Sequence, residues 1–169
     1  MTDEKALEFL RRHQPMPEDN KLDQEILDNY DEVREYFLIH PNPACIPLFL
    51  NSFGDGTGFG IYQLVEGVIR LFPSQVVIPH IEQALKSRHE SVRSWTTEIT
   101  ALFPCSELID PLEQMLHDDS LDIRIDAAFA LGLIEDSRTL PILEQALLHE
   151  NDPEFVMDLT EAIAKKRGG

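Results

Sequence analysis

Cationic side chains and cysteines are scarce in this 169-residue chain. Lysine and arginine number 14 against 31 aspartate and glutamate residues, so the formal net charge is −17. Nucleic acids and anionic membranes attract proteins mainly through lysine and arginine, and the composition therefore argues against both as partners. An acidic surface would attract a basic protein. It would also keep a protein soluble without binding anything, and the charge alone does not separate these two interpretations.

The acidic residues are unevenly spread along the chain. Residues 1–40 carry eleven acidic and five basic residues, and residues 76–106 carry three of each. Residues 107–161 carry fifteen acidic and two basic residues. We therefore expect the C-terminal part of the chain to present the most acidic surface.

Cysteine pairs and long apolar runs are also missing. Cys45 and Cys105 belong to no paired motif, so we predict two separate thiols rather than a disulfide framework. No apolar run reaches the roughly 18 residues that a membrane-spanning helix needs. The first residues show no basic segment followed by an apolar one, so we expect a cytoplasmic protein.

A repeat of 31 residues is the clearest pattern that the sequence does contain. Glutamate followed by glutamine occurs at positions 82, 113 and 144, a spacing of 31 in both steps. The tripeptide Leu-Phe-Pro starts at positions 71 and 102, and the related Leu-Ile-Glu starts at 133. Repeats of this length are typical of stacked supersecondary units.

Each repeat is predicted to contain two helices. The first helix is expected to start near a proline, because the missing N–H of proline costs nothing in a first turn. The second helix carries an apolar stripe with offsets of 0, 4, 7, 8 and 11, which is a helical and not a strand period. The stripe comprises Ile61, Val65, Val68, Ile69 and Phe72, then Val92, Thr96, Ile99, Thr100 and Phe103, then Ile123, Ala127, Ala130, Leu131 and Ile134, and finally Phe155, Leu159, Ala162 and Ile163.

The N-terminal region follows the repeat only loosely. Helices are predicted over residues 4–12 and 21–39, separated by the Pro15–Pro17 segment and ended by residues 40–43. We predict one all-α domain over residues 1–169, a right-handed α-α superhelix of about five helical pairs. Residues 1–43 would form divergent capping helices and residues 44–167 four repeat units, because a stack of repeats needs atypical ends.

The repeat and the segment Asp122–Asp136 resemble the HEAT-like repeats that also occur in phycobilin lyases and in some bacterial immunity proteins. The resemblance covers roughly residues 44–167 and implies a helical solenoid. It also implies a ladder between repeats, made by an acidic residue and an arginine near the start of each second helix. The matching residues are Asp122 with Arg124, and Arg93 with Ser91 in place of the acid.

A glycine-rich segment, Gly54–Gly60, interrupts the regular pattern. It has no Gly-Lys-Ser/Thr ending and no preceding strand, so neither a P-loop nor a dinucleotide site fits. Counting Asp55 as the first position of a calcium loop places Phe59 at a ligand position, which argues against calcium. Two interpretations stay open: a helix connection that needs positive φ angles, or a partner-binding loop.

No set of residues predicts catalysis. The six histidines lack metal-binding spacing, and no Gly-x-Ser-x-Gly elbow occurs. His117-Asp118-Asp119 has the composition of a metal phosphohydrolase dyad, but the repeat places it in a turn between helices. We expect no enzyme activity, no metal and no cofactor.

Partner-binding residues are expected in the glycine-rich segment and where the second helices face away from their apolar stripe, with Trp95 and Asp126 at the edge of the stripe. Aromatic and arginine residues at such positions often anchor interfaces. The candidates are Asp55, Tyr62, Glu66, Arg70, Trp95, Glu98, Asp126 and Phe129.

The function expected from these features is binding of a basic protein. A small acidic chain with few repeats suggests a bacterial immunity protein that neutralises a toxin through an acidic concave surface. A general scaffold or assembly factor is one alternative. A phycobilin lyase-like protein is another, although that activity would need a deep apolar groove.

Overall fold

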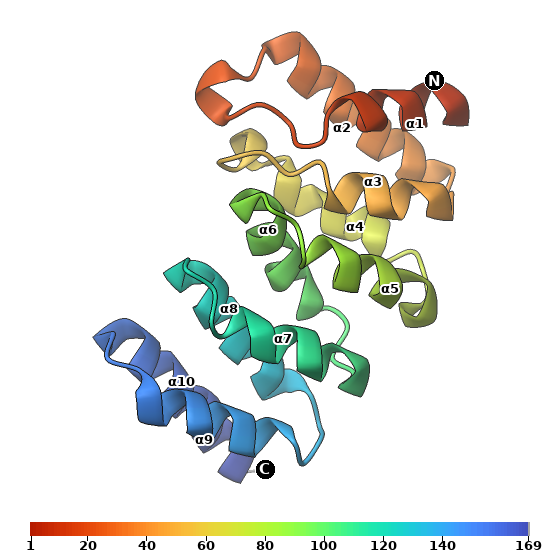
Figure 1. Ribbon diagram of the computed structural model, residues 1–169. Helices are drawn as coiled ribbons and strands as arrows, with labels where there is room; N and C mark the ends of the chain where they lie inside the picture. Colours follow the sequence, from red (N-terminus) through yellow and green to blue (C-terminus); the bar gives the residue numbers. More distant parts are fainter. Residues whose placement is uncertain (169) are drawn as a thin grey trace. The chain divides into compact units, whose positions relative to one another are not determined.

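The computed structural model describes residues 1–168, and every regular element in that range is helical (Figure 1). The predicted all-helical α-α solenoid is confirmed. The chain divides into two compact units, Met1–Trp95 and Thr96–Gly169, and each is described by itself. The α-helices are α1 (Asp3–Arg12), α2 (Gln24–Ile39), α3 (Ile46–Leu50), α4 (Val65–Ile69), α5 (Ser74–Ala84), α6 (Glu90–Thr100), α7 (Ile109–Met115), α8 (Leu121–Leu133), α9 (Thr139–His149) and α10 (Pro153–Gly168).

The first unit is built from helical pairs in two layers. Helix α3 packs against both α1 and α5, whereas α2 packs against α4. The helices predicted over residues 4–12 and 21–39 correspond to α1 and α2. Side chains cap both starts: Thr2 accepts a hydrogen bond from the N–H of Lys5, and Asp23 accepts one from the N–H of Glu25. The divergent N-terminal residues thus form a helical pair that occupies the same two layers as the repeats.

Buried aromatic side chains form the core of the first unit. The rings of Tyr30 and Tyr62 meet edge to face with centroids 5.7 Å apart, and Phe53 contacts Tyr62 at the same distance. Tyr30 also contacts Phe49 at 5.8 Å, and its hydroxyl forms a 2.7 Å hydrogen bond with Ser52. Edge-to-face contacts of this kind add specific attraction to the burial of the rings. The cluster joins α2, α3 and the segment that follows α3.

The glycine-rich segment folds over this aromatic cluster as a connection with left-handed backbone. Gly56, Gly58, Phe59 and Gly60 all have positive φ angles. The carboxylate of Asp19 accepts hydrogen bonds from the N–H groups of Thr57, at 3.0 Å, and Gly58, at 2.9 Å. The interpretation as a connection that needs positive φ is therefore confirmed.

The same segment changes the second helix of the first repeat. A regular helix was expected from about Ile61 onward, and this prediction is wrong. The chain instead forms two 3₁₀ turns, Gly58–Gly60 and Tyr62–Leu64, and the α-helical turns of α4 begin only at Val65. Left-handed residues cannot belong to a right-handed helix, so right-handed backbone begins only at Ile61, and its first turn has the 3₁₀ form.

The second unit pairs α7 with α8 and α9 with α10, and α8 packs closely along α10. Figure 1 shows α7 and α9 toward the viewer, with α8 and α10 behind them. The prediction that first helices start near a proline is confirmed for α7 and α9, where Pro111 and Pro141 are the third residues. It is wrong for α5, which begins at Ser74, five residues before Pro79, because Pro73 already ends the preceding segment.

Arginines near the start of the second helices hold the turn that precedes them. Arg93 donates a 3.0 Å hydrogen bond to the carbonyl of Ser87, and 31 residues later Arg124 donates a 2.9 Å bond to that of Asp118. The Arg124 Nε also lies 3.8 Å from a carboxylate oxygen of Glu150, in the turn of the next pair. Arg124 therefore joins successive pairs, but through Glu150 and not through the Asp122 that the resemblance implied.

Substitution of Gly58 by alanine tests the glycine connection. Gly58 has a φ of +54°, and an added Cβ would lie 2.6 Å from the ring of Tyr62. We expect Gly58→Ala to lower the free energy of unfolding by about 2–4 kcal/mol, measured by urea denaturation. Gly67→Ala is the matched control, because its Cβ would make only an ordinary contact 3.6 Å from Leu38. An unchanged stability for Gly58→Ala would contradict the role given to this glycine.

Candidate functional site

The outward side of α8 carries two acidic residues and an aromatic one in a single stripe. Asp122, Asp126 and Phe129 follow one another at intervals of four and three residues, which places them on one face of a helix. The opposite side of α8 buries Ile123, Ala127 and Leu131 against the rest of the unit. Asp122 and Phe129 are exposed, and Asp126 is half-buried.

Helix α10 continues this surface with a second stripe. Asp158, Glu161 and Lys165 follow one another at intervals of three and four residues, and together with Phe129 they line one cavity between α8 and α10. We call Glu98, Asp122, Asp126, Phe129, Asp158, Glu161 and Lys165 the acidic face. Sequence reasoning missed Asp158 and Glu161. A step of 32 residues, which allows for the inserted residue of the last repeat, leads to them from Asp126 and Phe129.

Asp126 is the most perturbed carboxylate of the acidic face. Burial raises its pKa from 3.8 to about 6, and the nearby charges of Glu98 and Asp122 act in the same direction. Among residues 1–168, no side chain forms a hydrogen bond or ion pair with Asp126. A half-buried carboxylate beside two further carboxylates is unfavourable for folding unless a cation from outside the chain compensates for it.

Phe129 is the exposed aromatic residue of the acidic face. Its side chain is 57% exposed, so much of the ring is accessible to a partner. The amino group of Lys165 lies 5.9 Å from the centroid of its ring, close enough for a weak cation–π contact. The ring therefore already faces a cation from the chain itself.

The predicted site residues of the first unit have different environments. Tyr62 was expected at an outward position, and this expectation is wrong, because its side chain is fully buried in the aromatic cluster. The short 3₁₀ turn around Tyr62 replaces the regular helix that the expected orientation assumed. Trp95 is half-buried: its ring stacks on Phe53 at 5.6 Å, and its indole N–H donates to the carbonyl of Gly56.

The remaining candidates of the first unit lie at its surface. Asp55 is exposed in the glycine-rich segment, and its backbone carbonyl accepts a hydrogen bond from the N–H of Asp19. Arg70, directly after α4, is exposed, and Glu66 within α4 is half-buried. Their predicted role in partner binding stays a prediction. Phe59, which sequence reasoning did not select, is 67% exposed and has a left-handed backbone.

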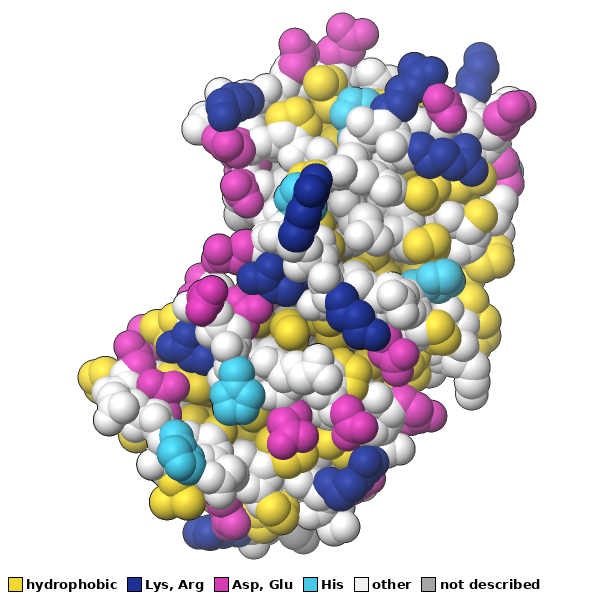
Figure 2. All heavy atoms as spheres, viewed as in Figure 1, with side chains coloured by type: hydrophobic (Ala, Val, Ile, Leu, Met, Phe, Trp, Pro, Cys, Tyr) yellow, Lys and Arg dark blue, Asp and Glu magenta, His cyan; other side chains and the backbone are white. Residues whose placement is uncertain are grey.

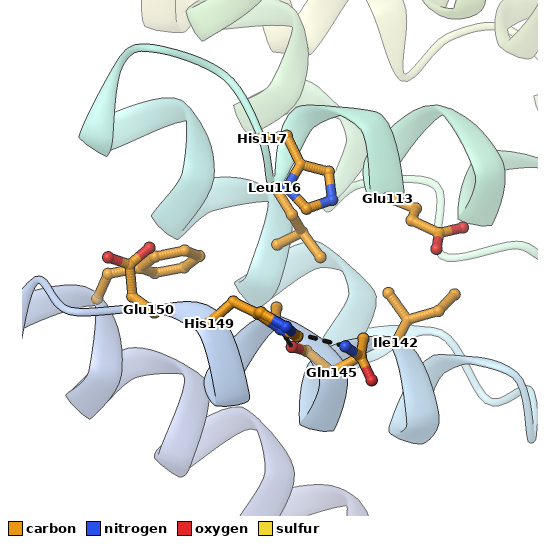
Figure 3. A pocket seen from close by; sticks show the side chains of 9 residues that line it. Glu113, Leu116, His117, Ile142, Gln145, His149 and Glu150 are labelled. Carbon is orange, nitrogen blue, oxygen red and sulfur yellow. Dashed lines mark hydrogen bonds between the residues drawn. The ribbon is translucent and has the colours of Figure 1, made fainter.

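A larger cavity lies on the other side of the second unit, between α7 and α9 (Figure 3). Its volume is about 410 Å³, and its lining includes His117 and Glu113 from the α7 side and His149 and Gln145 from α9. The Nδ1 of His149 contacts both the side-chain amide and the backbone carbonyl of Gln145, at 3.1 and 3.0 Å. The Nδ1 of His149 therefore has a partner within its own helix in either tautomer, as a donor to the carbonyl or as an acceptor from the amide.

Residues 1–168 contain few groups suited to catalysis or metal binding. No group of three or more histidine, cysteine, aspartate or glutamate side chains is placed to hold a metal ion. Burial raises the pKa of Cys45 to about 12 and also raises that of Cys105, which makes both thiols poor nucleophiles. Figure 2 shows acidic, basic and histidine side chains interspersed with hydrophobic ones on the α7 and α9 side of the second unit. None of the described helices is long and apolar enough to cross a membrane.

Substitution of Asp126 by asparagine tests the electrostatic state of the acidic face. The folded state binds the proton of Asp126 more tightly than the unfolded state does. The contribution of Asp126 to the free energy of unfolding therefore falls as the pH rises from about 4 to 6. We expect Asp126→Asn to raise the free energy of unfolding at pH 7 by about 1–2 kcal/mol, with allowance for solvent screening. The gain should shrink toward zero below pH 4, as measured by urea denaturation across this range.

Asp122→Asn is the control for this measurement, because Asp122 is exposed on the same helix. We expect it to change the free energy of unfolding by less than about 0.5 kcal/mol. A loss of stability at pH 7 for Asp126→Asn would show that Asp126 has a stabilising partner that the structure does not contain.

Comparison with known families places these features in a recognised architecture. A model of HEAT repeats matches residues 78–164, from within α5 to near the end of α10. The match covers just over half of the 169 residues and includes α6 to α9 in full. It contains every residue of the acidic face except Lys165. No curated protein matches the chain. The chain belongs to the family of HEAT repeat proteins.

Proposed function

We propose that this chain is a protein-binding module whose acidic face engages a basic partner protein. HEAT repeats generally serve as scaffolds for protein interactions and not as enzymes. The second unit, Thr96–Gly169, contains sixteen acidic and five basic residues, a net charge of −11. A surface of this charge speeds the approach of a basic protein and selects against acidic ones.

Asp126 is the observation that carries this proposal. Its carboxylate is half-buried, it lies near Glu98 and Asp122, and it has no partner among residues 1–168. A lysine or arginine from a partner would supply the missing charge and relieve the repulsion. The stability lost by keeping Asp126 unpaired in the free protein would then be recovered on binding.

Phe129 supports the same surface. An exposed aromatic ring beside charged residues is typical of a residue that anchors a protein interface. Asp126 and Phe129 are one helical turn apart on α8, so a single partner element could contact both.

We further infer that the partner is a toxin domain and that binding neutralises it. Support comes from the small size of the chain, its strong acidity and the resemblance to HEAT-like immunity proteins. A role like that of the phycobilin lyases has less support. The cavity between α7 and α9 has a mixed lining, in which Glu113 and Gln145 lie beside Ile142, and this is not the deep apolar groove that such an activity would need.

A binding measurement with a purified toxin domain encoded beside this chain tests the proposal. We expect Asp126→Lys and Phe129→Ala each to raise the dissociation constant about tenfold or more, measured by calorimetry. The association rate of the unaltered protein should fall as salt is added, because the attraction is electrostatic. Circular dichroism would confirm that both variants fold.

Glu113→Lys is the matched control, since it makes the same change in charge on the α7 side of the same unit. We expect it to bind nearly as well as the unaltered chain. If the toxin domain does not bind at all, the inhibitor role is wrong. If it binds equally well to Asp126→Lys and Glu113→Lys, the acidic face is not the interface.

A further inference from the structure

A small cavity between α8 and α10 has a lining suited to one positively charged side chain. It is bounded by Phe129 and Gly132 from α8 and by Asp158, Glu161 and Lys165, with Ala162, from α10. Its volume is about 110 Å³. This is well below the roughly 300 Å³ at which sites for small-molecule ligands begin, so the cavity suits a single side chain.

Small residues open this cavity where the two helices approach each other. The nearest atom to a Cβ added at Gly132 would be the Cβ of Ala162, at 3.5 Å. Larger residues at either position would fill the space below the ring of Phe129. The floor of the cavity is therefore helix backbone and small side chains, and its walls are one aromatic ring and two carboxylates.

The two carboxylates of the cavity are unpaired. Among residues 1–168, neither Asp158 nor Glu161 forms a side-chain hydrogen bond or an ion pair. Most other charged groups of the second unit do have partners, as Arg124 has Glu150 and Arg138 has Asp136. The only cation of the lining is Lys165, and it lies over the ring of Phe129. The cavity thus has acceptors and an aromatic face that the chain itself leaves largely unused.

We propose that this cavity binds one arginine side chain of the basic partner, with the guanidinium on the face of Phe129 and its N–H groups directed to Asp158 and Glu161. The inference rests on the proposed function, because it specifies what the acidic face recognises. Lys165 occupies the position of the incoming cation in the free protein and moves aside when the arginine enters.

Arginine fits this lining better than lysine for geometric reasons. Its planar guanidinium stacks on an aromatic ring while its edge donates several hydrogen bonds, so it can use the ring and both carboxylates at once. The lysine ammonium is a compact and strongly hydrated point charge, which Lys165 already provides. An incoming arginine therefore gains contacts that the internal lysine does not make.

An NMR titration of the full chain tests the cavity without the partner protein. The probes are three capped tripeptides, acetyl-Gly-X-Gly-amide, in which X is arginine, lysine or the uncharged arginine analogue citrulline. We expect the arginine peptide to shift the backbone amides of Phe129, Gly132 and Ala162, with a dissociation constant of about 1–10 mM. The lysine peptide should bind at least about threefold more weakly, and the citrulline peptide should cause no saturable shift.

Three variants identify the groups responsible. Phe129→Leu should weaken binding of the arginine peptide about three- to fivefold, and the double variant Asp158→Asn with Glu161→Gln should weaken it about fivefold or more. Lys165→Met should strengthen binding about twofold or more, because it removes the competing cation. The double variant Glu113→Gln with Glu154→Gln is the matched control, since it also removes two negative charges from the second unit, at exposed positions outside the cavity.

The outcomes separate this inference from the proposed function. Equal binding of the arginine and lysine peptides, or equal losses for the control double variant and the cavity double variant, would overturn the arginine site and indicate general attraction to an acidic surface. Selective arginine binding without any toxin complex would keep the cavity and remove the inhibitor role. A toxin complex that survives in the double variant would keep the proposed function and remove the arginine site.

Discussion

A pair of short helices cannot enclose its own apolar stripe, and this constraint underlies the rest of the structure. In the second unit, α8 buries Ile123, Ala127 and Leu131, and α10 buries Phe155, Leu159 and Ile163, by packing against each other and against their first helices. Stacking consumes one side of each second helix and leaves the other side to solvent. Residues on that free side do not have to maintain the fold, so they can differ between repeats and serve binding.

The first unit shows how far a repeat can depart from regularity when other contacts replace its helices. The left-handed glycines stand where a regular repeat would continue its helices, but Asp19 holds the segment by two backbone N–H groups and the rings of Tyr62 and Trp95 pack against each other beside it. The strength of these contacts explains why Tyr62 is a core residue. An aromatic residue beside an irregular loop has the composition of a binding site, yet here it stabilises the loop.

The second unit shows the opposite balance, in which exposed and unpaired groups reduce stability. Burial and like charges raise the pKa of Asp126, and Asp158 and Glu161 remain without partners among residues 1–168. A chain selected for stability alone would replace or pair Asp126 and Asp158, because both are half-buried, whereas Glu161 is exposed and costs little. Their concentration on one face, beside exposed Phe129, is what a binding surface for a basic partner requires.

The periodicity of the sequence was enough to predict the helical pairs and the apolar stripes. Each helix buries one side, and this imposes a helical spacing of apolar residues that is visible in the sequence. It also identified Glu98 and Phe129 as outward residues and placed Asp126 at the edge of the stripe, where it is half-buried. The periodicity could not predict the orientation of the Tyr62 side chain, which depends on the left-handed residues that precede it in the chain. The periodicity could not predict the cavity between α8 and α10 either, because Phe129 and Asp158 line the same cavity only when two helices from successive repeats pack together. Local spacing determines which side of a helix a residue occupies, whereas contacts across helices are decided by how closely their small residues let them approach.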